Sequence, residues 1–365
     1  MAIRSSTSPV SKLNFFRGIR SMAAEDEQRV LCLNVWCGDL WDDRTYRWYC
    51  IAPPISQTPQ KRPCNGGLNS KIHIIRNYDT RDQSMPPPLD IDTSSQQITV
   101  RNGQPMIGIM ASPSAVTLDG KLHVFSGDVQ PSYEVFDPTT NQWEALPPPS
   151  DGFQETIPYQ PVPYEKEKKI LFPNYNDNVS MSTFDVATNS WEYGGYPLLE
   201  PSVLAYGSNQ DLSTLLARTY MGGRVILGDL LYMFLEPNND FFAYDLKNKQ
   251  LLQVHGLEGE TEFLYRQSDQ YSLRRTPVFL FQLGKEDLCL VSAQGPVCGG
   301  LHVICLKFKV QKRYDGDLQV VLLGRDSYYI DDGIRLEDCV AIKRPGLRTS
   351  AIPCFYDPDS GKQEV

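Results

Sequence analysis

The chain has 365 residues, of which 41% are hydrophobic and 22% are charged, and its formal net charge is −9 at pH 7. This composition is ordinary for a globular protein. The acidic balance argues against general binding to nucleic acid or to anionic membranes, because both require basic patches. The sequence also contains no apolar run near the ~20 residues that a membrane-spanning helix needs.

A basic segment begins the chain. Residues 1–24 include Arg4, Lys12, Arg17 and Arg20, are rich in serine and contain no acidic residue. This composition occurs in organelle transit peptides; a disordered tail and the remnant of a lost domain are the alternatives. We predict a flexible extension over residues 1–27 and leave its role open among these three.

A short sequence frame recurs along the rest of the chain. In each copy an aromatic or aliphatic residue is followed by Asp, then a polar turn, and then an apolar residue seven places after the first. The clearest copies begin at Phe136, Phe184 and Tyr244, and weaker copies begin at Trp41 and Ile91. The closing residues are Trp48, Ile98, Trp143, Trp191 and Leu251. Their spacing of 45 to 60 residues is typical of propeller blades.

The chemistry of each frame predicts a turn between two strands. The Asp side chain is expected to accept hydrogen bonds from the backbone that follows it, which bends the chain. Asn141, Asn189 and Asn248 are expected to provide the left-handed conformation that such a turn often needs. The closing Trp or Leu then opens the return strand, and we predict that it packs between neighbouring sheets and does not stack on a ligand.

A second hairpin precedes most of the frames. The clearest one runs from 115 to 125 around Asp119-Gly120, a dipeptide that strongly indicates a hairpin when apolar alternation flanks it. Similar patterns occur at 69–75, 166–172, 224–234 and 284–291. Each unit therefore contains four strands. We predict an all-β fold, a β-propeller of six four-stranded blades.

The two ends of the chain are predicted to share the closing blade, which would remove exposed sheet edges. Strands at 29–36 and 46–52 need partners from the C-terminus, and the candidates are 336–343 and 351–356. The sixth blade is assembled from 287–291, 301–310 and 318–323. A short helix is predicted at 211–218, inside an insertion between two blades.

These motifs resemble the kelch-repeat superfamily, and most closely plant F-box/kelch-repeat proteins. The resemblance is carried by Asp119–Asp128, Tyr133–Pro138 and Trp143–Pro149. The Gly-Gly doublet of the family is replaced here by Ser126-Gly127, and the N-terminal segment is too short for the family's F-box. The resemblance implies a kelch-like propeller over residues 28–356, followed by a flexible tail over residues 357–365.

The same resemblance implies a non-enzymatic module that holds a protein or peptide partner, as a substrate-recognition or scaffold protein linked to ubiquitin-ligase pathways. Family members often bind peptides on the loops that follow the second and fourth strands of each blade. On this chain the loops after the second strands supply the candidate partner-binding residues, which are Arg76, Tyr78, Asp128, Gln130, Asn174, Tyr175, Asn176, Glu236 and Asn238. We expect a monomer that binds neither nucleic acid nor membrane.

No catalytic, metal or cofactor site is predicted. The nine cysteines form no C-x-x-C pair, which indicates reduced thiols in an intracellular protein. This favours the cytoplasm or nucleus, with organelle targeting through residues 1–24 as the alternative. His73 and His123 occupy equivalent strand positions and are expected to pack, not to bind metal. Two other readings stay open: a propeller enzyme of the metal-dependent oxidase or specifier-protein class, and a degenerate or truncated family member.

Overall fold

The computed structural model describes a series of strands and part of their connections. The described residues are 29–37, 45–50, 54–59, 64–68, 71–75, 87–92, 99–108, 113–126, 133–148, 161–173, 180–197, 223–235, 240–257, 259–260, 278–294, 301–314, 316–330, 333–343, 355–357 and 362–364. Within these ranges every regular element is a strand, so the predicted all-β class is confirmed. No helix in the described ranges has the length and apolar character of a membrane span. The predicted helix at 211–218 lies outside the described residues.

Most strands belong to four-stranded antiparallel sheets in which consecutive strands pair. One such sheet holds β4 (Cys64–Leu68), β5 (Lys71–Ile75), β6 (Leu89–Asp92) and β7 (Thr99–Asn102). The next holds β8 (Ser114–Leu118), β9 (Lys121–Phe125), β10 (Tyr133–Asp137) and β11 (Gln142–Ala145). A third holds β12 (Val162–Tyr164), β13 (Lys169–Pro173), β14 (Ser180–Asp185) and β15 (Ser190–Pro197).

An eight-stranded sheet follows, and it is composed of two antiparallel halves. The first half holds β16 (Arg224–Leu227), β17 (Leu230–Leu235), β18 (Asp240–Asp245) and β19 (Gln250–His255). The second half holds β20 (Phe279–Gln282), β21 (Asp287–Gln294), β22 (Leu301–Lys312) and β23 (Leu318–Ile330). The halves meet in only two parallel residue pairs, Val254 with Leu318 and His255 with Gln319.

The two ends of the chain meet in one further four-stranded sheet. Its strand order is β24 (Gly333–Lys343), β1 (Arg29–Cys37), β2 (Thr45–Cys50) and β3 (Pro54–Pro59). The C-terminus contributes one strand and the N-terminus three. Of the predicted second C-terminal strand at 351–356, Phe355 and Tyr356 do not join this sheet, because β25 (Phe355–Asp357) pairs with β26 (Lys362–Glu364) instead, and 351–354 lie outside the described residues. Strand β3 was missed because prolines mark both of its ends; proline fits an edge strand, where a missing N–H breaks no ladder.

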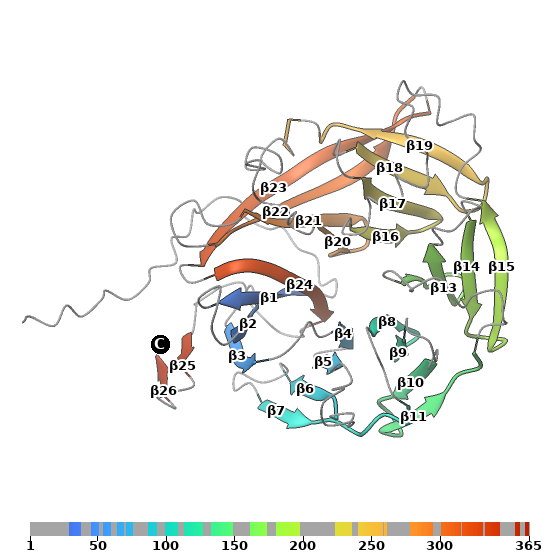
Figure 1. Ribbon diagram of the computed structural model, residues 1–365. Coiled ribbons are helices and arrows are strands. Elements are labelled where there is room, and N and C mark those ends of the chain that lie inside the picture. Colours follow the sequence, from blue (N-terminus) through green and yellow to red (C-terminus); the bar gives the residue numbers. More distant parts are fainter. Residues whose placement is uncertain are drawn as a thin grey trace, which may run out of the picture.

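The sheets surround a common centre (Figure 1). The first strands of successive sheets contact one another in the order β24, β4, β8, β12, β16 and β20, and β20 contacts β24 again. The fourth strands, such as β7, β11 and β15, lie on the outside of the ring (Figure 1). Each sheet thus presents its two faces to its neighbours, which explains why side chains on both faces of the inner strands are buried.

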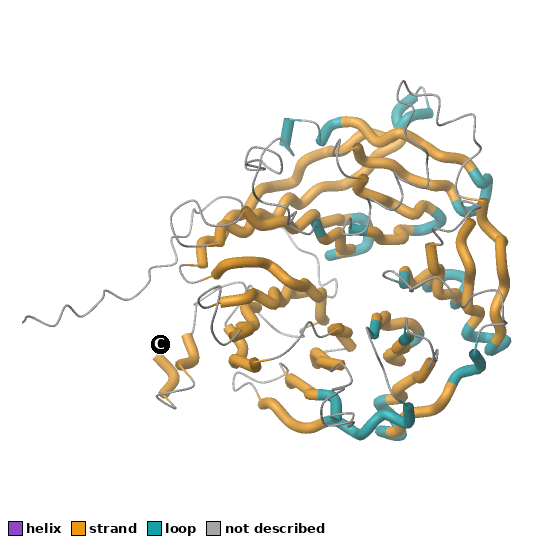
Figure 2. The backbone as a smooth tube through the Cα atoms, viewed as in Figure 1, coloured by secondary structure: helices purple, strands orange, loops and turns teal. Residues whose placement is uncertain are grey.

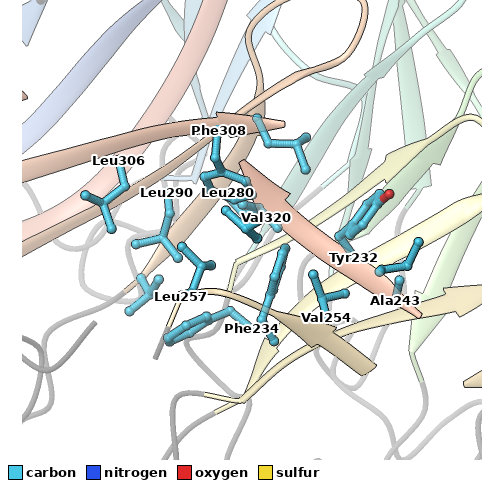
Figure 3. Close-up of a cluster of buried hydrophobic side chains, with 14 of the residues drawn as sticks. Tyr232, Phe234, Ala243, Val254, Leu257, Leu280, Leu290, Leu306, Phe308 and Val320 are labelled. Atoms are coloured by element: carbon cyan, nitrogen blue, oxygen red, sulfur yellow. The ribbon is translucent and has the colours of Figure 1, made fainter. Parts of the chain in front are cut away.

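The core consists of separate clusters between neighbouring sheets. The largest lies between the two halves of the eight-stranded sheet and contains Tyr232, Phe234, Leu290 and Phe308, all buried (Figure 3). At the inner edge of this interface Gly223 lies directly against the backbone of Leu280, where a Cβ atom has no room. Burial between sheets is the main stabilising term, at roughly 25 cal/mol per Å² of apolar surface removed from water.

The Asp turns form as the recurring frame predicts. Asp185 Oδ1 accepts hydrogen bonds from the backbone N–H groups of Ala187 (2.9 Å) and Thr188 (3.0 Å). The equivalent Asp137 Oδ1 accepts from the backbone N–H of Thr139 (2.8 Å), and the hydrogen bonds from Thr139 hold the pKa of Asp137 well below its ordinary value. These short turns separate the third and fourth strands of their sheets (Figure 2).

The left-handed residue of each Asp turn lies four places after the Asp. Asn141 and Asn189 adopt φ angles of 57° and 53°, as predicted. In the third copy the prediction of Asn248 is wrong, because Lys249 adopts the left-handed conformation with φ 56°. Asn248 instead donates from its backbone N–H and its side-chain amide to Asp245, at 2.8 Å in both cases.

Two of the closing tryptophans, Trp143 and Trp191, lie at equivalent places between sheets. Trp191 of β15 contacts the rings of Phe125 and Tyr133 in the preceding sheet and those of Phe172 and Phe184 in its own sheet. Its indole N–H donates to the carbonyl of Pro147 at 2.9 Å. Trp143 of β11 repeats the arrangement, since its indole N–H donates to the carbonyl of Gln104 at 3.0 Å. Each indole therefore links its own sheet to the segment that leads into that sheet from the preceding one.

Candidate interaction face

The two ends of the sheets differ in the length of the segments that join their strands. At one end, the turn end, two to six residues join first to second strands and third to fourth strands; examples are 119–120, 138–141, 165–168, 186–189, 228–229 and 246–249. At the other, the connection end, four to thirteen residues join second to third strands, namely 76–88, 126–132, 174–179, 236–239 and 295–300, and the segments between sheets lie at the same end. Long connections tolerate sequence change and carry binding function more often than tight turns do.

Contacts between side chains show that turns of successive sheets lie side by side at the turn end. Lys168 Nζ lies 3.0 Å from Asp119 Oδ2, which joins the third sheet to the second. Lys166 Nζ lies 2.6 Å from Asp229 Oδ2, and the Tyr164 hydroxyl donates to Asp229 Oδ1 at 2.7 Å. The hydrogen bond from Lys166 lowers the pKa of Asp229, and that from Tyr164 lowers it further. Lys166 and Lys168 are thus paired with carboxylates of neighbouring sheets.

All nine predicted partner-binding residues belong to the connection end. They lie in four of the segments that join second to third strands, and all nine are outside the described residues. The described strands nevertheless show where these segments begin and end: they start after β5, β9, β13 and β17 and return at β6, β10, β14 and β18. Because these strands occupy equivalent places in their sheets, the four segments start from the same end of the ring (Figure 1).

The base from which these segments start is rigidly packed. Ile75, Phe125 and Phe234 occupy equivalent positions near the ends of their second strands, and each is at most 1% exposed. Phe125 contacts Phe172 of the neighbouring sheet edge-to-face, with ring centroids 4.7 Å apart. Loops that start from fixed core residues can present variable side chains in a constant arrangement.

One connection between sheets is held by a buried carboxylate. Glu134 of β10 is 1% exposed, and it accepts hydrogen bonds from the backbone N–H groups of Ile107 (2.9 Å) and Gly108. The Ile107 side chain is 63% exposed at this end of the ring. Sequence reasoning missed both residues. One sequence signal was available: Glu134 lies two residues before Phe136, so both side chains point to the same face of the strand, where an apolar residue is expected.

The two strand histidines lie in different sheet interfaces. His73 Nδ1 lies 2.8 Å from Asp90 Oδ1, and its ring contacts Phe136 of the next sheet with centroids 5.5 Å apart. His123 is 1% exposed, and neither of its ring nitrogens has a hydrogen-bond partner among the described residues. Burial lowers the pKa of His123 to about 4, and the charge of Lys121 lowers it further. The two imidazoles do not converge on one site.

Potential metal ligands do not gather in one place within the described residues. No group of three or more His, Cys, Asp or Glu side chains within the described ranges is placed to hold a metal ion. Cys289 and Cys305 are buried and unbridged, as expected for small apolar fillers.

Comparison with known proteins gives one distant relative. No protein-family model matches the chain. An F-box/kelch-repeat protein of Arabidopsis thaliana is 25% identical over 163 residues, which is 43% of this chain and 40% of that protein. The chain therefore matches well under half of the relative's length. Together with the repeated sheets, this homology supports a kelch-like, propeller-like relationship.

A solved structure also aligns with part of the chain. The nidogen/laminin complex covers 62% of this chain and 92% of its own matched chain, with a TM-score of 0.35 and 12% sequence identity. Similarity at this level assigns neither a fold nor a binding partner.

Proposed function

We propose that the chain is a six-bladed kelch-like β-propeller over residues 28–356, and that it is a non-enzymatic protein-interaction module. The observation that carries the proposal is the closed circuit of six first strands, from β24 through β4, β8, β12, β16 and β20 back to β24. In this reading the eight-stranded sheet is two blades joined at one end, and the sheet that contains β24 and β1 closes the ring. Closure removes sheet edges and produces a rigid disc.

The proposed binding surface is the connection end of the disc. It carries the segments with Arg76, Tyr78, Tyr175 and the other predicted partner-binding residues, whereas Lys166 and Lys168 at the turn end are already paired with carboxylates of neighbouring sheets. Tyr and Arg are common where proteins bind one another. The distant F-box/kelch-repeat relative supports a role as a substrate-recognition or scaffold protein linked to ubiquitin-ligase pathways. A monomer in the cytoplasm or nucleus is part of the proposal.

The test is affinity purification of the full chain from cells, followed by mass spectrometry. We expect Arg76→Ala combined with Tyr175→Ala to reduce recovery of specific partners about tenfold, because two anchor side chains are removed from the connection end. Lys247→Ala combined with Gln142→Ala is the matched control, since both residues are exposed, and Lys247 lies in a turn of the turn end. Partners lost from the control and retained by the double variant would reverse the assignment of the binding face.

The non-enzymatic part of the proposal has its own measurement. Metal analysis of the purified protein distinguishes an interaction module from an enzyme of the metal-dependent oxidase or specifier-protein class. We expect substoichiometric iron and copper. One iron or copper per chain, retained through dialysis against a chelator, would favour the enzyme.

A further inference from the structure

Two cysteines occupy opposite positions in the four-stranded sheet that joins the two ends of the chain, called here the closing sheet. In the pairing of β1 with β2, Cys32 is the register partner of Cys50. The ladder runs from this pair to Cys37 with Thr45 without a register shift. Among the strand pairs of the described residues, this is the only register pair that consists of two cysteines.

The spacing of opposite residues in an antiparallel ladder fits a disulfide bond. Such residues share a face of the sheet, and their Cα atoms lie about 4.5 or 5.5 Å apart, depending on their place in the hydrogen-bond pattern. Disulfides join cysteines whose Cα atoms lie about 4.4–6.8 Å apart. Because both spacings of the ladder fall within this range, the backbones of β1 and β2 hold Cys32 and Cys50 at a separation that a disulfide spans.

The other cysteines of the described strands do not share this arrangement. Cys339 of β24 pairs with Leu33, the chain neighbour of Cys32, and therefore belongs to the opposite face of the closing sheet. Cys289 and Cys305 lie on neighbouring strands but two register positions apart, so they are diagonal partners. Diagonal partners lie about 7–8 Å apart, and a disulfide spans that distance only if the backbone moves.

The cysteine pair lies where a covalent bond would act on closure of the ring. Cys32 pairs with Val340 of β24 on one side and with Cys50 of β2 on the other, and Figure 1 shows β1 between these two strands. A bond between Cys32 and Cys50 closes the chain between them into a loop. Loop closure restricts the unfolded chain and so stabilises the folded one. The bond would therefore strengthen the sheet in which N-terminal and C-terminal strands meet.

We propose that Cys32 and Cys50 form a reversible disulfide that responds to the redox state of the surroundings and stabilises the closing sheet. Disulfides of reducing compartments are mostly of this transient, redox-sensing kind. The inference concerns the closing sheet alone and does not depend on the function proposed for the connection end.

The oxidant in this reaction is a low-molecular-weight disulfide such as oxidised glutathione. The thiolate of one cysteine attacks it, releases one glutathione thiol and forms a mixed disulfide. The thiolate of the other cysteine then attacks the first cysteine's sulfur and displaces the second glutathione thiol. Two electrons pass from the cysteines to the oxidant, and the two cysteine protons end on the two released thiols. Excess reduced glutathione reverses both steps.

The test equilibrates the full chain in buffers of reduced and oxidised glutathione, alkylates the remaining thiols in denaturant and analyses the product by mass spectrometry. The reduced chain should take up one alkyl group for each of its nine cysteines, and the oxidised chain should take up two fewer. Digestion should give a single linked peptide pair that contains Cys32 and Cys50. Oxidation should raise the unfolding temperature by about 3–5 °C, and dithiothreitol should reverse the rise.

Cys50→Ser removes one partner and should abolish both the linked peptide pair and the rise in unfolding temperature. Cys339→Ser is the matched control and should retain both, because it changes a cysteine of the same sheet and leaves the register pair intact. If Cys50→Ser does not fold, the linked peptides of the parent chain still decide the assignment.

Two results would overturn the proposed disulfide and leave the proposed function standing. One is uptake of an alkyl group by every cysteine in all of the glutathione buffers. The other is a linkage between any two cysteines other than Cys32 and Cys50. A linked pair that forms without a rise in the unfolding temperature would overturn the stabilising role of the bond.

Discussion

One residue position shows how equivalent places in the sheets accept different side chains. His123 pairs with Val135, two residues before Asp137, and Leu171 pairs with Thr183, two residues before Asp185. The same place in the next sheet holds Tyr232, whose pKa burial raises to about 12. His, Leu and Tyr all fill an interface between sheets. The imidazole of His123 must stay neutral to do so, since a buried charge without a partner is costly.

The neutral state of His123 predicts a specific pH dependence of stability. Its pKa is about 4 in the folded chain and about 6.5 when unfolded. The unfolded chain therefore binds a proton first as the pH falls, so stability is lost between about pH 6.5 and pH 4, by about 3 kcal/mol in total. His123→Leu, which copies Leu171, should remove this part of the slope in urea titrations from pH 7 to pH 4. An unchanged slope in the variant would show that other groups cause it.

Trp191 packs between two neighbouring sheets, and its replacement tests how much this packing stabilises the fold. Trp191→Ala should lower the free energy of unfolding by about 3–5 kcal/mol, because four aromatic contacts and the bond to the Pro147 carbonyl are lost. Trp191→Leu should cost less, since Leu251 occupies the corresponding place in another frame. Urea unfolding gives both values, and the exposed Gln142→Ala is expected to stay within about 0.5 kcal/mol of the parent. Equal losses for Ala and Leu would contradict a packing role.

At the scale of the element, the Asp turns gain stability from a residue that tolerates a left-handed backbone. Asn141→Ala should cost about 1 kcal/mol, because a Cβ-bearing residue without a local polar side chain is disfavoured at φ 57°. Lys249→Gly should stabilise the third turn by a similar amount, since φ 56° is freely available to glycine. Thermal unfolding of the two variants checks the opposite signs. Two changes of the same sign would mean that side-chain contacts, not backbone strain, decide these turns.

The same turns show which elements are predictable from sequence. Asp137, Asp185 and Asp245 carry local chemistry, since each binds backbone N–H groups two or three residues away, and the frame located these turns. Asn248 misled the prediction because residue type was given more weight than its distance from the Asp. Strand β3 was missed for a related reason: prolines indicate a loop locally, and only pairing with β2 makes the segment a strand.

The candidate binding surface was harder to predict, for a physical reason: a binding loop has no local motif comparable to the Asp turn. Its loops were chosen from the kelch resemblance, and because all nine residues lie outside the described part of the chain, that choice stays a prediction.

At the scale of the whole molecule, stability depends on joining the two ends of the chain. β1 pairs with β24 from Arg29 with Lys343 to Cys37 with Gly333, and β24 also contacts β4 on one side and β20 on the other. Without β24 the circuit of first strands is open, and β1 has an unpaired edge next to the centre. The sheets on either side then lose one packing surface each.

We therefore expect a chain ending at Ile330 to lose cooperative unfolding, or to unfold at least about 10 °C lower, because the apolar surfaces that β24 covers become exposed to water. A chain ending at Cys354 is the control: it lacks β25 and β26, which pair with each other and touch the ring only beside the edge strand β3 among the described strands, and it should unfold within a few degrees of the parent. Calorimetry and near-UV circular dichroism distinguish the two shortened chains. If the chain ending at Ile330 unfolds as cooperatively and at the same temperature as the control, the ring is not closed by β24, and the closed circuit on which the interaction disc is proposed does not stabilise the fold.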